Sequence, residues 1–212
     1  MASSKITTLR QVFKYYAFLL VVWGFFRFLF KLPDLVEELW FKPVIWLLPI
    51  LIIWANDKKP INFFGGKLLP TLTYGLFLGA FYWLVFGVIQ ITKNGWSGTF
   101  QVSGSGWIDF AGISLATAIT EELAFSGYLF NKLVLVNRQV WLAITTTSVM
   151  FTLLHLSIGL FVYKYNLTQM IFFLILVFIV QTGNVWVMSR TKNVLGPILS
   201  HWLYGLAAFL IA

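Results

Sequence analysis

The stretch AITEELAFSG, residues 118–127, places two adjacent carboxylates, Glu121 and Glu122, near the middle of an otherwise apolar run over residues 107–130. A run of about 20 mostly apolar residues is long enough to cross a bilayer as a helix. An ionisable side chain at the bilayer centre costs about 2.5–3.5 kcal/mol even on the gentler insertion scale. The pair therefore indicates a membrane helix that carries either a functional site or a specific structural partner.

The composition of the whole chain favours a membrane protein. Of its 212 residues, 59% are hydrophobic, 19% are aromatic and only 10% are charged, whereas a soluble domain carries about 25% charged residues. The mean hydropathy is +0.85. These values exclude a soluble enzyme, a disordered chain and a nucleic-acid-binding domain, so we expect a lipid bilayer and no nucleic acid as partner. Because there is no cysteine, disulfides, thiolate metal sites and a cysteine nucleophile are excluded.

Apolar runs divide the chain into about seven predicted spans, which form one all-α membrane domain over residues 1–212. The second run is short and contains Pro49, so it is kinked, re-entrant or extended backwards through Leu39 and Trp40. The predicted spans cover residues 12–30, 43–55, 68–91, 107–130, 140–162, 167–188 and 194–212.

Basic residues predict the orientation of these spans, since cytoplasmic loops carry an excess of Lys and Arg. With the N-terminus inside, ten basic residues fall in inner segments: Lys5, Arg10, Lys14, Lys58, Lys59, Lys67, Lys132, Arg138, Arg190 and Lys192. Four fall in outer segments: Lys31, Lys42, Lys93 and Lys164. This bias predicts a cytoplasmic N-terminus, an external polar loop over residues 93–106 and an external C-terminus.

Two histidines are the only other ionisable residues predicted near the middle of spans. His155 lies in the fifth predicted span and His201 in the seventh, whereas no Lys or Arg is predicted in mid-span to pair with Glu121 or Glu122. A lone buried Glu or His often has only a structural role. Two of each together form the set that water activation requires, so we expect Glu121, His155 and His201 to line one cavity, open to the cytoplasmic side.

Residue spacing refines this expectation, because residues four apart share one helix face. Glu122 and Ser126 form such a pair, as do Phe151 and His155, and His201 and Gly205. Successive residues on a helix diverge by about 100°. One of the two adjacent glutamates should therefore face the site while the other braces a neighbouring helix.

At these residues the chain resembles the CPBP family, which contains CAAX prenyl proteases and bacteriocin-processing proteins and is also called the Abi family. Glu121, Glu122 and Gly127 match its Glu-Glu-x-x-x-Arg-Gly motif, Phe151 and His155 match its Phe-x-x-x-His motif, and His201 matches its last histidine. The resemblance covers residues 108–209. Ser126 stands where the family has Arg, and Gly205 stands where it has Asn or Asp.

The resemblance implies a helical bundle of eight or fewer spans that acts as an intramembrane endopeptidase on a peptide or membrane protein. It implies that Glu121 and His155 activate water and that His201 helps to stabilise the oxyanion, with Glu122 and Phe151 in support. Bacteriocin maturation or self-immunity is the implied context, in a bacterial plasma membrane. Asn184, with Gln181 beside it, offers a substitute hydrogen-bond donor in the sixth predicted span.

Three alternatives stay open on the sequence. Glu121, His155 and His201 could ligate Zn²⁺, although the divergence of the two glutamates favours a metal-free mechanism without a cofactor. The loss of the Arg and Asn positions allows a catalytically impaired member that serves as an immunity or scaffold protein. A proton-coupled carrier is the third reading. The sequence indicates no oligomeric state.

Overall fold

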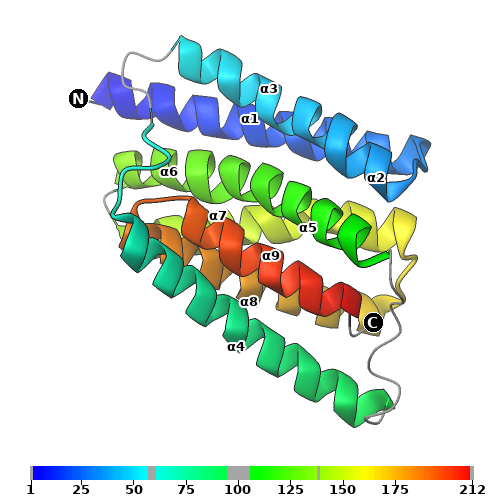
Figure 1. Cartoon of the computed structure of the whole chain (residues 1–212). Helices are drawn as coiled ribbons and strands as arrows, with labels where there is room; N and C mark the ends of the chain where they lie inside the picture. The colour runs from blue at the N-terminus through cyan, green and yellow to red at the C-terminus, as the bar shows by residue number, and fades with distance from the viewer. Residues whose placement is uncertain (1, 57–60, 95–105, 138, 211–212) are drawn as a thin grey trace.

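The computed structural model describes residues 2–56, 61–94, 106–137 and 139–210, and every regular element in these ranges is helical. The prediction of an all-α membrane bundle is confirmed (Figure 1). Residues 95–105 of the predicted external loop lie outside the described ranges, as do Lys58, Lys59 and Arg138. The helical segments, in chain order, are α1 (Ala2–Leu29); α2 (Asp34–Val36), η1 (Glu37–Phe41) and α3 (Lys42–Ala55); α4 (Leu68–Asn94); α5 (Gly106–Glu122), η3 (Leu123–Leu129) and α6 (Phe130–Asn137); α7 (Val140–Leu154) and η4 (Ile158–Val162); α8 (Leu167–Thr191); and α9 (Leu195–Leu210).

Five of these segments are long and apolar enough to cross a membrane, judged by length and composition: Lys5–Leu29, Asp34–Ala55, Leu68–Ile89, Val140–Val162 and Leu167–Thr191. The outer surface of the bundle is apolar as well. Phe77 and Leu69 are each 76% exposed, and Phe172 is 69% exposed. Such side chains are costly to leave in water, so lipid must cover them, and the chain is an integral membrane protein.

The second span is longer than residues 43–55. It begins at Asp34 and continues through the π-helical turns of η1 into α3, so the predicted backward extension through Leu39 and Trp40 is present. Pro49 lies inside α3 and does not end the helix. The extension carries several charged residues into the bundle.

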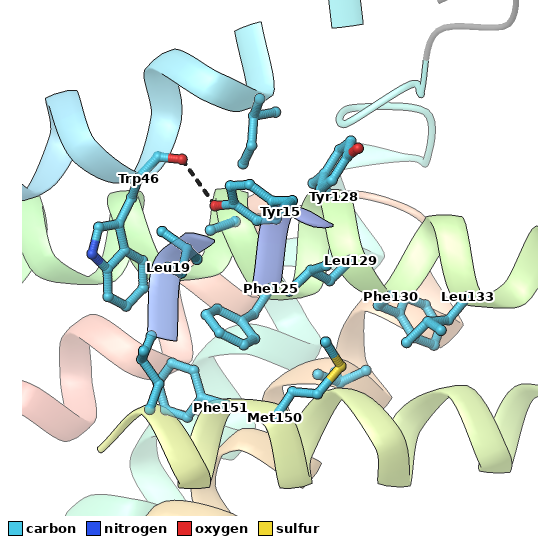
Figure 2. Packing of buried hydrophobic residues seen from close by; sticks show 14 of the residues in the cluster. Tyr15, Leu19, Trp46, Phe125, Tyr128, Leu129, Phe130, Leu133, Met150 and Phe151 are labelled. Carbon is cyan, nitrogen blue, oxygen red and sulfur yellow. Dashed lines mark hydrogen bonds between the residues drawn. The ribbon is translucent and has the colours of Figure 1, made fainter. Parts of the chain in front are cut away.

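Aromatic packing joins α1 and α3 to the segments that carry the site (Figure 2). The Tyr15 hydroxyl donates to the Trp46 carbonyl at 2.9 Å, which ties α1 to α3. The rings of Phe125 and Phe151 meet edge to face, with centroids 4.9 Å apart, which ties η3 to α7. Because a close-packed core permits little movement, these contacts fix the helices around the glutamate pair.

The turn between α8 and α9 brings these two helices side by side. Lys192 ends α8 in the left-handed conformation, with φ of 56°. The Asn193 side chain then accepts from the backbone N–H of Leu195 at 3.0 Å, at the start of α9. This tight connection aligns Asn184 on α8 with His201 on α9.

Candidate active site

Segments far apart in the sequence meet at a cavity of about 350 Å³. Glu121 from α5, His155 from the end of α7 and His201 from α9 all line it. Phe151 and Gly205 line it too. The structure therefore brings together the three residues expected to act on water, whose roles the geometry alone leaves open.

Glu122 lies outside this cavity, in a fully buried polar cluster. Its Oε1 accepts from Asn184 Nδ2 at 2.8 Å and from His201 Nδ1 at 2.7 Å. The Ser126 hydroxyl donates to Oε2. The two adjacent glutamates thus point in different directions, and Glu122 braces α8 and α9 against η3.

The bond to Glu122 determines which nitrogen of His201 carries a proton. A carboxylate only accepts hydrogen bonds, so Nδ1 of His201 must be protonated and Nε2 points away from Glu122. This Nε2 lies 3.7 Å from Glu121 Oε2. That separation is too long for a direct hydrogen bond, but one water at about 2.8 Å from each atom would bridge it.

The Nδ1 atom of His155 is also held by a hydrogen bond, in this case to a backbone carbonyl. His155 follows the last residue of α7, where the helix is interrupted, and its Nδ1 lies 2.9 Å from the Phe151 carbonyl. A carbonyl oxygen also only accepts, so Nδ1 carries the proton and Nε2 keeps its lone pair. The Phe151 ring packs on the imidazole, with centroids 4.3 Å apart, and helps to hold it.

The expectation that no Lys or Arg lies in mid-span is wrong. Lys42, predicted in an external segment, is buried in the second span because that helix begins at Asp34. Its Nζ lies 2.6 Å from Glu121 Oε1 and 2.7 Å from Glu38 Oε2. The spacing of Glu38 and Lys42, opposite charges four residues apart, was the signal that could have shown a helix here.

A second cation continues this cluster towards the end of the bundle. Arg27 on α1 pairs with Glu37 and lies 3.4 Å from Glu38 Oε1. Thr117, one turn before Glu121, donates to Glu38 Oε2 at 2.7 Å. Charges taken out of water require partners of this kind, and these partners explain how so many ionisable residues lie inside the bundle.

The two departures from the motif pattern have different surroundings. Ser126 is fully buried and bonded to Glu122, so its position is part of the polar cluster. Gly205 faces Ser114 on α5, where an added Cβ would overlap Ser114 Oγ and lie 3.3 Å from its Cβ. A side chain at position 205 would therefore require Ser114 to move.

Part of the cavity lining lies at one end of the bundle. Its lining includes Asp34 and Tyr163, which are exposed at the end of the bundle where α1 finishes. That end is opposite to the N-terminus. With the cytoplasmic N-terminus that the basic residues predict, Asp34 and Tyr163 lie at the external end of the bundle, and the side on which the cavity opens stays a prediction.

The residues do not fit the zinc alternative. Glu121 would have to ligate the metal while the Lys42 ammonium stays 2.6 Å from its Oε1, and a second cation beside that oxygen would be repelled. Within the described ranges, no three acidic or histidine side chains are grouped to hold a metal ion. We derive no step through a metal.

Comparison with known proteins gives one match. The family model for "Type II CAAX prenyl endopeptidase Rce1-like" matches residues 103–207. No curated protein and no solved structure matches the chain. The matched residues run from just before α5 to within α9, and they include Glu121, His155 and His201.

Proposed function

Because residues 103–207 belong to the Rce1-like family of type II CAAX prenyl endopeptidases, we propose that this membrane protein hydrolyses peptide bonds within the bilayer. Glu121 is the general base in this proposal. The observation that carries it is the cavity that Glu121 shares with His155 and His201. In that cavity each histidine keeps its Nδ1 for another partner and leaves Nε2 for water or substrate.

The reaction begins with a water held between Glu121 Oε2 and His201 Nε2, which are 3.7 Å apart. Glu121 takes a proton from this water as its oxygen attacks the scissile carbonyl carbon. A tetrahedral intermediate forms, with negative charge on the former carbonyl oxygen. When the C–N bond breaks, the proton on Glu121 passes to the leaving amine, so the carboxylate is restored.

The histidines have separate tasks in this scheme. His155, with Nδ1–H bonded to the Phe151 carbonyl, presents Nε2 as an acceptor that orients the attacking water. His201 carries a proton on both ring nitrogens in this scheme, so Nε2–H donates first to the attacking water and then to the oxyanion, and Glu122 balances the charge of the imidazolium. Donors fixed in advance in a site without bulk water stabilise such an intermediate strongly.

A second function has one observation in its favour. Gly205 lacks the side chain of the Asn or Asp that resembling proteins carry, so one oxyanion donor is missing. The loss of one such donor in other enzymes costs about 10²–10³ in kcat. A member that binds a peptide in the same cavity without cleaving it, as a scaffold or immunity protein, is the alternative.

The test is cleavage of a membrane-peptide library by the purified protein in liposomes, read by mass spectrometry. Glu121→Gln keeps the size of the side chain but cannot take a proton, so kcat should fall by about 10²–10⁴-fold. The kcat of His155→Ala should also fall sharply. Glu37→Gln is the matched control, since Glu37 is a buried glutamate outside the cavity lining, and it should cleave normally.

Two results would count against the proposal. Cleavage that survives both Glu121→Gln and His155→Ala would show that another group is the base. A wild-type protein that binds library peptides and cleaves none of them would favour the scaffold function.

A further inference from the structure

We propose that Lys42 is a positioning residue for Glu121, so that the second span completes a site whose other residues lie within the family segment. This inference rests on the proposed function. Lys42 lies outside the matched residues 103–207, yet it lines the same cavity as Glu121, His155 and His201. Nothing in the motif pattern assigns it a role.

The contact between Lys42 and Glu121 belongs to a closed arrangement of four side chains, which we call the α3–α5 ladder. Its members are Glu38, Lys42, Thr117 and Glu121. Glu38 and Lys42 are four residues apart on one helical segment and are bonded at 2.7 Å. Thr117 and Glu121 are four apart on α5. The Thr117 hydroxyl reaches Glu38 at 2.7 Å, and Lys42 reaches Glu121 at 2.6 Å.

The ladder holds the ammonium group in one place. Lys42 is only 3% exposed, and its Nζ lies 5.3 Å from the centre of the Trp46 ring and 5.9 Å from that of Trp23. An exposed lysine would move through many rotamers, but here two carboxylates and two indole faces surround the charge. The position of Nζ is therefore fixed, and it fixes the Glu121 oxygen that it contacts.

Because of this contact, the two carboxylate oxygens of Glu121 have different partners. Oε1 is bound to Lys42 at 2.6 Å, and Oε2 faces His201 Nε2 at 3.7 Å. Without Lys42 the carboxylate could rotate and offer either oxygen to several partners. With it, a single oxygen faces the bridging water. Lys42 also balances the charge of Glu121, which is directly adjacent to Glu122 in the chain.

Lys42→Met should therefore lower kcat by about 10²-fold, the loss that a misplacement of roughly 1 Å causes elsewhere, and leave KM within about twofold. Lys42→Arg keeps the charge and should insert normally. Its longer, planar head group cannot occupy the same point, so kcat should still fall by about tenfold. Lys132→Met is the matched control, because Lys132 is also buried but lies on α6, away from the cavity lining.

If Lys42 had only a structural role, its loss would lower the abundance of the protein and not the kcat of the inserted molecules. Lys42→Met leaves Glu38 and Glu121 buried without their shared cation, so poor insertion alone could lower activity. The double variant Glu38→Gln/Lys42→Met removes one of those charges and should regain abundance. If Lys42 positions Glu121, the kcat of the double variant stays low at restored abundance.

Each result is decisive for one of the two proposals. If the wild-type protein cleaves and Lys42→Met or Lys42→Arg matches its kcat, the positioning role is wrong. It is also wrong if the double variant regains kcat together with abundance. If the wild-type protein itself cleaves nothing, the proposed function fails, independently of any Lys42 variant.

Discussion

Glu122→Gln should leave the protein folded and His201 in its present orientation, so that cleavage stays measurable. Glu121→Gln, in contrast, should abolish cleavage. Glu122 Oε1 accepts from both Asn184 and His201, and Oε2 accepts from Ser126. A glutamine can keep its oxygen on the Asn184 and His201 side and point its NH₂ at Ser126 Oγ. The Ser126 hydroxyl is then free to donate to Gln181, whose Nε2 now lies 3.5 Å away. Gln181 Oε1 is buried without a hydrogen-bond partner among the described residues, and a half-turn of its amide would bring that oxygen to the hydroxyl.

The size of the effect follows from this exchange. Hydrogen bonds to a charged group contribute about 1.5–3 kcal/mol, and neutral ones about 0.5–1.5 kcal/mol. Three bonds to Glu122 lose their charge, which costs about 1 kcal/mol each, and one new bond at Gln181 returns about 1 kcal/mol. The net loss in the free energy of unfolding is about 2 kcal/mol. Adding Ser126→Ala strands the new NH₂ and should cost about 1–3 kcal/mol more.

Two measurements check this reasoning. Thermal unfolding in detergent compares Glu122→Gln, Ser126→Ala and the double variant. Nitrogen-15 NMR of histidine-labelled protein reports whether His201 Nδ1 stays protonated, with His155 as the internal control, because the chain has only these two histidines. The reasoning is refuted if Ser126→Ala adds no loss in the Glu122→Gln background, or if His201 Nδ1 loses its proton there. Cleavage should be measurable for Glu122→Gln and absent for Glu121→Gln; the reverse order would exchange the roles of the two glutamates.

Three further predictions test the surroundings of the site. Cleavage should be unchanged by a metal chelator, measured with the library peptide, because Lys42 occupies Glu121; inhibition that zinc reverses would contradict this. Gly205→Ala should lower the free energy of unfolding by about 1–3 kcal/mol, as overpacking does, and Ser114→Ala should relieve most of that loss because Ser114 Oγ is the atom in the way; additive losses would show that the two do not touch. Tyr163→Cys, which introduces the only thiol of the chain, should react with a membrane-impermeant maleimide from outside intact cells, whereas labelling only after lysis would place the cavity opening inside.

The helical fold could be predicted from the sequence because lipid imposes a simple rule. Apolar runs of about 20 residues must be helical where every backbone polar group needs an internal partner. The beginning of the second span could not be predicted in the same way. Asp34, Glu37, Glu38 and Lys42 resemble a polar loop when they are read singly. The helix continues through them because Glu37 pairs with Arg27 on α1 and Glu38 pairs with Lys42.

The same limitation explains what sequence reasoning found and missed in the site. Glu121, His155 and His201 stand out because each is an ionisable residue inside an apolar run, so position alone marks them. The spacing of Glu38 and Lys42 indicates a helix, but nothing local marks Lys42 as a partner of Glu121. That contact forms only when α3 packs against α5 and brings the ammonium to Glu121, and a contact between segments nearly eighty residues apart is a property of the tertiary fold. Likewise, only the packing of α5 on α9 shows that a side chain at Gly205 would meet Ser114.

The replacement of Arg by Ser126 and the presence of Lys42 are best understood together. A buried carboxylate pair needs compensating charge, and an arginine beside Glu122 would supply it from the same helix. In this chain Asn184 on α8 and the small Ser126 side chain both donate to Glu122, so that carboxylate is satisfied by hydrogen bonds and by His201. The cation instead comes from α3 and contacts Glu121. In the proposed mechanism the compensating cation contacts the general base and not the supporting glutamate, so we expect cleavage to depend on the N-terminal helices.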